Sequence, residues 1–278
     1  MQRITVRVPA TTSNLGPGFD CLGAALALHN RVRVTRGDKG RMPPIAAAAA
    51  RKFFARTGAK PFSFRCEIDG DVPMGRGLGS SATVRAGVVV ALNELARTDL
   101  SRLDLFSLTA VLEGHPDNAA PAIFGGFTVA RGESVQRFQI DRALHFVLLV
   151  PAFAVETARA RRLLPKKISR LEAVRSAGNA AAITAAFATR EYEKLRGSFR
   201  DGLHQPFRKK LVPFLDDAIT AAENAGALGA FLSGSGSTIC AIALAEAGKI
   251  GRAMRRACPT EADIRIVHAD NRGARIAR

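Results

Sequence analysis

The chain has 278 residues, of which 47% are hydrophobic, and its formal net charge is +17. This apolar content supports one large folded domain or two smaller ones and argues against disorder. No stretch approaches the roughly 18 apolar residues of a membrane span, and the N-terminus lacks the apolar core of a secretory signal. The four cysteines, Cys21, Cys66, Cys240 and Cys258, have no metal-type spacing. We therefore expect a cytoplasmic protein with free thiols and no membrane partner.

The basic residues are spread along the chain, which has no Trp and one Tyr. Stacking platforms for single-stranded nucleic acid are therefore scarce. The densest basic stretch, Arg159 to Lys167, is interrupted by two leucines and a proline. We interpret the charge as a solvated basic surface and expect no nucleic-acid partner. A basic nucleic-acid-binding protein is kept as the alternative from a different functional class.

Apolar alternation and helical periodicity predict an α+β fold. Strands are predicted at 3–8, 31–35, 62–68, 146–150, 228–233, 238–244 and 264–268. Helices are predicted near 45–57, 81–96, 101–112, 169–188, 208–225 and 245–257. A new apolar strand begins at Phe146, after the glycine-rich stretch 124–127. We therefore place a domain boundary near residue 145 and divide the chain into 1–145 and 146–278.

The run from Gly75 to Ser81 lies between a predicted strand and a predicted helix. Alternating glycines let backbone N–H groups turn inward, and a helix start adds unpaired N–H groups and a positive dipole end. No Lys-Ser/Thr pair closes the run as in a Walker A loop, and no third glycine completes a dinucleotide fingerprint. We predict a phosphate cradle in which a Cβ at Gly77 or Gly79 would collide with bound phosphate or force an unfavourable backbone angle. A flexible Gly/Ser turn is the alternative.

Two further polar segments follow predicted elements. The first, from Pro9 to Asp20, is longer than a hairpin turn needs and carries Asn14 and Asp20, although turn chemistry and a local cap also explain these two residues. The second, from Glu113 to Asn118, offers a carboxylate that could ligate Mg²⁺. Its histidine, His115, could donate to a substrate carboxylate or cap the C-terminus of the preceding helix.

Three residues in the second half of the chain could hold an anionic substrate. Thr157 and Arg161 are four residues apart, so they share one face if the segment is helical. Arg208 offers another guanidinium, which can grip a carboxylate at two points. The glycine-rich run from Gly234 to Ser237 is either a hairpin turn or a source of backbone N–H groups near a reacting phosphate.

Together, four segments resemble those of the GHMP small-molecule kinases and, within them, the homoserine kinases. They are PATTSNLGPGFD at 9–20, PMGRGLGSSA at 73–82, EGHPDNAAPAIFGGF at 113–127 and AFLSGSGS at 230–237, in family order. The second is similar to the superfamily's ATP loop, and the first and third narrow the resemblance to homoserine kinases.

The resemblance implies a two-domain α+β GHMP-kinase fold, with a ribosomal-protein-like N-terminal domain and a ferredoxin-like C-terminal domain. It implies ATP-dependent phosphorylation of the L-homoserine side-chain hydroxyl to O-phospho-L-homoserine, on the route to threonine. ATP and Mg²⁺ are the implied cofactors and L-homoserine the implied small-molecule partner, and a homodimer is compatible with the family. Another GHMP kinase of the mevalonate or isoprenoid type is the alternative enzyme, but its substrate lacks the ammonium and carboxylate pair.

The resemblance also implies residue roles. The nucleotide contacts are Pro73, Gly75, Arg76, Gly77, Leu78, Gly79, Ser80 and Ser81. The Mg²⁺ ligands are Ser81 and Glu113. The substrate contacts are Asn14, Asp20, His115, Asn118, Arg161, Arg208 and Gly234, with Asp20 suited to the ammonium group and the two arginines to the carboxylate. Asn118 and Thr157 are the implied catalytic residues, and catalysis rests on positioning and charge neutralisation rather than on a dedicated base.

Overall fold

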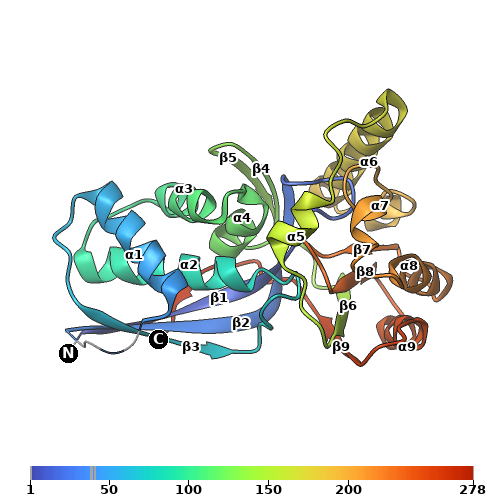
Figure 1. Ribbon diagram of the computed structural model, residues 1–278. Helices are drawn as coiled ribbons and strands as arrows, with labels where there is room; N and C mark the ends of the chain where they lie inside the picture. The colour runs from blue at the N-terminus through green and yellow to red at the C-terminus, as the bar shows by residue number, and fades with distance from the viewer. Residues whose placement is uncertain (1, 38–39, 41, 278) are drawn as a thin grey trace.

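The computed structural model describes residues 2–37, 40 and 42–277, and two antiparallel sheets form its frame (Figure 1). The strands of the first sheet are β1 (Arg3–Ser13), β2 (Leu22–Arg36), β3 (Phe64–Gly70), β4 (Phe127–Arg131), β5 (Ser134–Phe138) and β10 (Arg275–Ile276). Their order is β10-β1-β2-β4-β5, and β3 also pairs with β2. The second sheet has the order β7-β8-β6-β9, formed by β6 (His145–Pro151), β7 (Gly229–Leu232), β8 (Ile239–Ala243) and β9 (Ala262–Val267).

Helices cover both sheets (Figure 1). They are α1 (Pro44–Thr57), α2 (Ser80–Ala96), α3 (Arg102–Glu113), α4 (Pro116–Phe124), α5 (Thr157–Arg162), α6 (Arg170–Thr189), α7 (Gln205–Arg208), α8 (Leu215–Asn224), α9 (Ala247–Ala257) and a 3₁₀ turn at Tyr192–Leu195. Among the described residues, no helix is both long and apolar enough to cross a lipid bilayer.

Most predicted elements are present with shifted ends, and the differences have local causes. The predicted helix 208–225 is wrong, because α7 ends at Arg208 and α8 starts only at Leu215. Pro213 lies in this gap, and a proline disfavours the helical conformation of the residue before it. β2 is much longer than the predicted strand 31–35, because its first five residues are all buried and so show no alternation.

The core continues from one sheet to the other. Val8 and Val32 of the first sheet pack with Leu92 and Phe106 of the helices above it in one cluster. A second cluster joins Phe127 of the first sheet to α6, where its ring stacks on that of Phe187 at a centroid distance of 4.2 Å. This shared core fixes the loops of the two sheets relative to each other.

The C-terminal segment returns to the first sheet. β10 pairs with β1, and the backbone N–H of Ala277 donates to the carbonyl of Thr5. Asp270 anchors this segment, since its carboxylate contacts His29 Nε2 at 2.6 Å and Arg275 Nη1 at 2.9 Å. The division into 1–145 and 146–278 therefore stays a proposal with one amendment, because residues from Asp270 onward pack with the first sheet.

Candidate active site

A cavity of about 450 Å³ lies between the two sheets and is lined by loops from both. Fourteen of the predicted site residues line it: Asn14, Asp20, Gly75, Gly77, Gly79, Ser80, Ser81, Glu113, His115, Asn118, Thr157, Arg161, Arg208 and Gly234. The structure thus brings together segments that are up to 220 residues apart in the sequence, as the hydrogen bond from Asn14 Nδ2 to the Gly234 carbonyl illustrates.

Three residues predicted to contact the nucleotide do not line this cavity. Leu78 is 1% exposed and belongs to the core that joins the sheets. Arg76 instead donates from Nη2 to the carbonyl of Ala152 at 2.6 Å, and Pro73 precedes the lining part of the loop. These residues hold the loop in place rather than present side chains to the cavity.

The glycine loop has the left-handed backbone that its glycines allow. The φ angles of Gly75, Gly77 and Gly79 are +68°, +75° and +65°, a region that residues with a Cβ rarely adopt. The predicted unfavourable backbone angle is therefore present at Gly77 and Gly79, and a Cβ at either position would also collide within the protein. A Cβ at Gly77 would lie 2.1 Å from the carbonyl oxygen of Ser233, and one at Gly79 would lie 1.9 Å from Thr11 Oγ1.

The loop leads directly into the N-terminus of α2. Within the described ranges 2–37, 40 and 42–277, no side chain caps this 17-residue helix, and its first turn carries no acidic residue. The N–H groups of a first helical turn have no partner within the helix, and the helix dipole makes that end positive. This end of the cavity is therefore suited to an anion such as phosphate.

Glu113, the last residue of α3, accepts hydrogen bonds from two residues near the start of α2. Ser81 Oγ donates to Glu113 Oε2 at 2.9 Å, so the two predicted metal ligands lie together. Arg85 Nη1 donates to the other carboxylate oxygen, Oε1. Only 5% of the Glu113 side chain is exposed, so these contacts fix its orientation. Arg85 also lines the cavity, and the sequence did not reveal it because it sits in an ordinary helical pattern.

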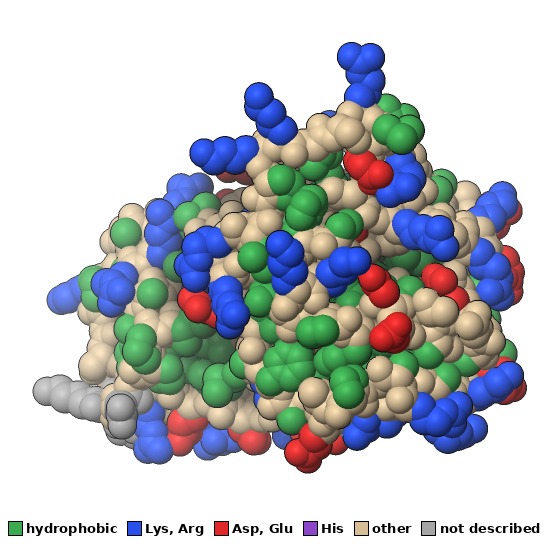
Figure 2. Space-filling model, turned by 45° about the vertical axis from the view of Figure 1, so that its right-hand side comes forward, with side chains coloured by type: hydrophobic (Ala, Val, Ile, Leu, Met, Phe, Trp, Pro, Cys, Tyr) green, Lys and Arg blue, Asp and Glu red, His purple; other side chains and the backbone are tan. Residues whose placement is uncertain are grey.

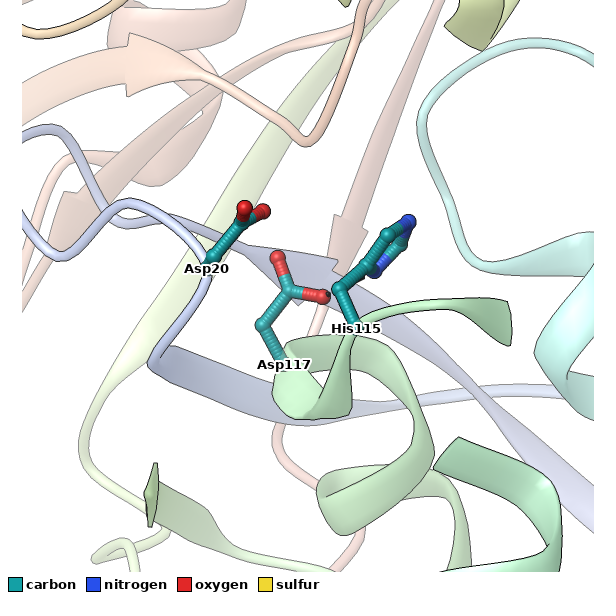
Figure 3. A group of neighbouring side chains, drawn as sticks. All are labelled: Asp20, His115 and Asp117. Carbon is teal, nitrogen blue, oxygen red and sulfur yellow. Dashed lines mark hydrogen bonds and ion pairs between the residues drawn. The ribbon is translucent and has the colours of Figure 1, made fainter. Parts of the chain in front are cut away.

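Three acidic or imidazole side chains gather at the other end of the cavity. Figure 3 shows Asp117 between Asp20 and His115, and one ligand atom from each lies within 4.8 Å of the others. His115 Nδ1 contacts Asp117 Oδ1 at 2.7 Å. Burial opposes protonation of His115, but the hydrogen bond and charge of Asp117 outweigh it and raise the pKa of His115. His115 precedes α4 as its N-cap residue, so the expectation of a C-terminal cap is wrong.

Asp117 was missed in the sequence even though it lies between two predicted residues. It is 2% exposed and accepts hydrogen bonds from His115 and from Asn118 Nδ2. The Asn118 amide is fixed in turn, since its Oδ1 accepts from Thr11 Oγ1 at 2.7 Å and its Nδ2 donates to Ser13 Oγ at 3.0 Å. A buried acid is rarely tolerated without partners, so its position beside a histidine was the available signal.

Asp20 and Arg161, which were predicted to bind opposite ends of a substrate, pair with each other. Arg161 Nη1 and Nη2 donate to the two carboxylate oxygens of Asp20 at 3.0 and 2.6 Å. This hydrogen-bonded pairing raises the pKa of Arg161 further above its usual value. Thr157 lies one helical turn before Arg161 in α5, so the prediction that the two residues share one helix face is confirmed. Its Oγ1 lies 3.3 Å from Ser235 Oγ.

Arg208 is buried at 2% exposure and under-satisfied. Its Nη1 donates to the Gly234 carbonyl at 2.8 Å, while its buried Nε has no hydrogen-bond partner among the residues that the structure describes. Burial, with the nearby charge of Arg161, lowers the pKa of Arg208 to about 10. Both guanidiniums lie over the ring of Phe19, at 5.4 Å for Arg161 and 5.1 Å for Arg208.

His204 lies against the Arg208 side chain, and it was not predicted from the sequence as a site residue. It is fully buried, stacks on Phe19 and lies with Nε2 2.8 Å from the Gly16 carbonyl. Burial lowers its pKa, so the neutral ring is favoured. With Nε2 donating to Gly16, Nδ1 is left as an acceptor, and it faces Arg208 Nη1 at 3.4 Å.

Comparison with known proteins defines the class. Residues 44–126 match the family described as GHMP kinases N terminal domain, and residues 172–260 match GHMP kinases C terminal. The chain is therefore a GHMP kinase. It is 40% identical to a homoserine kinase of Microchaete diplosiphon over 98% of this chain and 96% of that protein. It is 39% identical to a homoserine kinase of Moorella thermoacetica over 91% of each. The chain belongs to the homoserine kinase family.

Solved structures agree with this assignment. The crystal structure of a homoserine kinase from Cytophaga hutchinsonii matches with a TM-score of 0.89 and 29% identity, covering 100% of this chain and 98% of that one. A mevalonate kinase structure matches with a TM-score of 0.72 at 15% identity, a likeness of fold alone. The predicted family and its two-domain α+β fold are thus confirmed.

Proposed function

We propose that this chain transfers the γ-phosphoryl group of ATP to the side-chain hydroxyl of L-homoserine, forming O-phospho-L-homoserine for threonine biosynthesis. One observation carries the proposal. A single cavity has an uncapped helix N-terminus behind a glycine loop at one end and a charge pair of opposite signs, Asp20 and Arg161, at the other. This arrangement suits a triphosphate facing an amino acid.

The triphosphate binds at the glycine loop, from Gly75 to Ser81. Left-handed glycines let consecutive N–H groups converge on one anion, and the first turn of α2 adds further donors. Backbone donors are fixed before the ligand arrives, so they stabilise developing charge without reorganisation.

Ser81 and Glu113 would hold Mg²⁺ beside the triphosphate. Their oxygens are already adjacent, and a hydroxyl and a carboxylate are hard oxygen ligands of the kind that Mg²⁺ prefers. When bound, the ion neutralises negative charge on the phosphate oxygens. Glu113 is almost buried and anchored by Arg85, so its Oε2 stays aimed at the same place.

L-Homoserine carries the same two charges as the Asp20 and Arg161 side chains. Its ammonium group replaces the guanidinium on Asp20, with Asp117 and His115 close by, and its carboxylate replaces Asp20 on Arg161. Opening the existing ion pair costs little, because each side chain is about one third exposed, at 33% and 35%, and each regains a charged partner. A substrate with one charge would leave one side chain unpaired.

Arg208 completes the carboxylate site. Its buried Nε lacks an acceptor, and leaving a buried donor unpaired costs about 1–3 kcal/mol, so a carboxylate there is favoured. The loop that carries Asp20 is tied to this site, because Asn14 accepts from the Asp20 N–H and donates to the Gly234 carbonyl.

Phosphoryl transfer then depends on alignment. Asn118 and Thr157 line the cavity between its two ends and orient the substrate hydroxyl and the phosphoryl group. The hydroxyl oxygen bonds to the γ-phosphorus as the bond to the β-phosphate oxygen breaks. In such a loose transition state the hydroxyl loses its proton late, to an oxygen of the transferred phosphoryl group, so no side chain needs to remove it first. Positioning and fixed charge therefore supply the catalysis.

A coupled assay of ADP release tests the proposal directly. We expect turnover with L-homoserine, little with L-serine, whose hydroxyl is one methylene shorter, and none with mevalonate, which has no ammonium group. L-Threonine is the fourth substrate of the panel, with its hydroxyl on the same carbon as that of serine. Turnover with mevalonate equal to that with L-homoserine would reject the amino-acid site and leave only the GHMP kinase class.

The four cysteines support a reducing compartment. Cys21, Cys66, Cys240 and Cys258 are all free thiols in the structure. Disulfides are rare in reducing compartments such as the cytoplasm. We therefore also propose that the enzyme works in the cytoplasm. On the face shown in Figure 2, Lys and Arg side chains are dispersed among Asp and Glu, which supports a solvated basic surface.

A further inference from the structure

Arg85 lies at the phosphate end of the cavity, where it anchors Glu113. It belongs to α2, one helical turn after Ser81, and residues four apart on a helix share one face. Arg85, Ser81 and Glu113 line the same cavity as the glycine loop. A cationic side chain is therefore built into the floor of the proposed triphosphate site.

The guanidinium of Arg85 is only partly used. Its Nη1 donates to Glu113 Oε1, whereas its Nε is buried and finds no hydrogen-bond partner in the described part of the chain. The side chain is 23% exposed. A guanidinium has five N–H donors and no acceptor, so Arg85 keeps donors for oxygen atoms that the protein does not supply. Phosphate oxygens meet this need.

The other arginines in or near the cavity already have hydrogen-bond partners of their own. Arg161 pairs with Asp20, and Arg208 donates to Gly234, both at the substrate end. Arg76, inside the glycine loop, donates to the Ala152 carbonyl. Arg85 is thus the arginine of this cavity that lies beside the α2 N-terminus.

The two oxygens of the Glu113 carboxylate have different partners. Ser81 contacts Oε2 and Arg85 contacts Oε1. An ion held by Ser81 and Oε2 leaves the Arg85 contact intact, so the guanidinium and the metal do not compete for one oxygen.

We propose that Arg85 is a phosphate-binding residue, which gives the triphosphate a fixed side-chain charge, whereas the glycine loop's own Arg76 donates to the Ala152 carbonyl. This inference rests on the proposed function, because it presumes a nucleotide at the loop. Arg85 is a cation that binds phosphate without a metal ion, so its contribution can be measured as nucleotide binding in the absence of turnover.

The test measures binding of a non-hydrolysable ATP analogue, adenylyl imidodiphosphate, by isothermal titration calorimetry in EDTA. Arg85→Met alone would leave the buried Glu113 charge unpaired and could unfold the protein. The comparison is therefore between Glu113→Gln and the double variants Glu113→Gln/Arg85→Met and Glu113→Gln/Arg85→Lys. Arg51→Met, an exposed arginine of α1, is the matched control.

We expect Arg85→Met to weaken metal-free analogue binding by about tenfold to a hundredfold in the Glu113→Gln background, as befits a charge-assisted hydrogen bond. Arg85→Lys should fall between, since it keeps the charge but loses the fork. Adenosine, which has no phosphate, should bind Glu113→Gln and Glu113→Gln/Arg85→Met with equal affinity. Circular dichroism melts confirm that each variant is folded.

Two results would overturn the role of Arg85. One is equal analogue binding with and without Arg85, and the other is an equal loss of adenosine binding, which would mean that the side chain only supports the fold. A wild-type protein that binds no analogue at any Mg²⁺ concentration would instead contradict the proposed kinase function itself.

Discussion

Asp20 and Arg161 form a two-point ion pair that joins the loop after β1 to helix α5, with N–O distances of 3.0 and 2.6 Å. The pair spans the two halves of the chain and closes the substrate end of the cavity. It consists of one negative and one positive side chain, which are complementary to the ammonium and carboxylate groups of an amino acid. We therefore propose that the two side chains pair with each other until the charged groups of the substrate replace this contact.

Replacing Arg161 by Met should raise the KM for L-homoserine by roughly tenfold to a hundredfold, because a charged hydrogen bond is worth about 1.5–3 kcal/mol. The KM for ATP should change little. Steady-state kinetics with each substrate varied in turn measures both values. Arg159→Met, an exposed arginine of the same helix, is the control. A rise in the ATP KM instead would move Arg161 to the nucleotide site.

His204 should act on L-homoserine binding through Arg208. Replacing it by Gln removes the Nδ1 acceptor that faces Arg208 Nη1, so we expect a higher KM for L-homoserine with an unchanged KM for ATP. Equal changes in both constants would show a general loss of structure rather than positioning.

The same histidine predicts a pH dependence of stability. Burial lowers the pKa of His204 in the folded state, so the unfolded chain binds more protons between that lowered value and about 6.5. Stability from His204 is therefore lost as pH falls below about 6.5. Urea denaturation at several pH values should show a steeper acid loss for wild type than for His204→Gln. Identical slopes would contradict a neutral buried His204.

Sequence patterns predicted the glycine loop before α2 and the shared helical face of Thr157 and Arg161, because glycine alternation and helical spacing are local properties. They did not reveal that Asp20 would pair with Arg161, because that contact depends on how two sheets pack. Asp117 and His204 carry no periodic signal, and their importance comes from burial. α4 was missed because its two prolines, Pro116 and Pro121, resemble loop residues.

Gly79→Ala tests the reason for the glycine. In the wild-type background the new Cβ would meet Thr11 Oγ1 at 1.9 Å, in addition to a cost of roughly 1–2 kcal/mol for the left-handed backbone. In a Thr11→Ala background the collision with Oγ1 is removed, and the backbone cost remains together with two closer-than-usual contacts of the new Cβ, at 3.1 Å from Asn118 Oδ1 and 3.1 Å from the Cβ of residue 11. Urea denaturation of the four proteins measures the difference. An equal loss in both backgrounds would mean that the Thr11 contact is unimportant.

Glu113→Gln should require a much higher Mg²⁺ concentration for half-maximal rate and should lower kcat, because a neutral amide is a poorer ligand for Mg²⁺. The fold should persist, since Gln keeps the shape. Titration of the rate with Mg²⁺ is the measurement, and Glu94→Gln, an exposed acid of α2, is the control. Unchanged Mg²⁺ dependence would place the metal ligand elsewhere.

The most direct test of the amino-acid site compares kcat/KM for L-homoserine with that for two analogues that each keep the hydroxyl and one charge. These are 4-hydroxybutanoate, which lacks the ammonium group, and 3-aminopropan-1-ol, which lacks the carboxylate. A site built for a charge rejects a ligand without it by a large factor, so wild type should strongly prefer L-homoserine over both. Arg161→Met should narrow the preference over 3-aminopropan-1-ol, and Asp20→Asn the preference over 4-hydroxybutanoate. Equal kcat/KM for all three compounds in the wild-type protein would contradict the account.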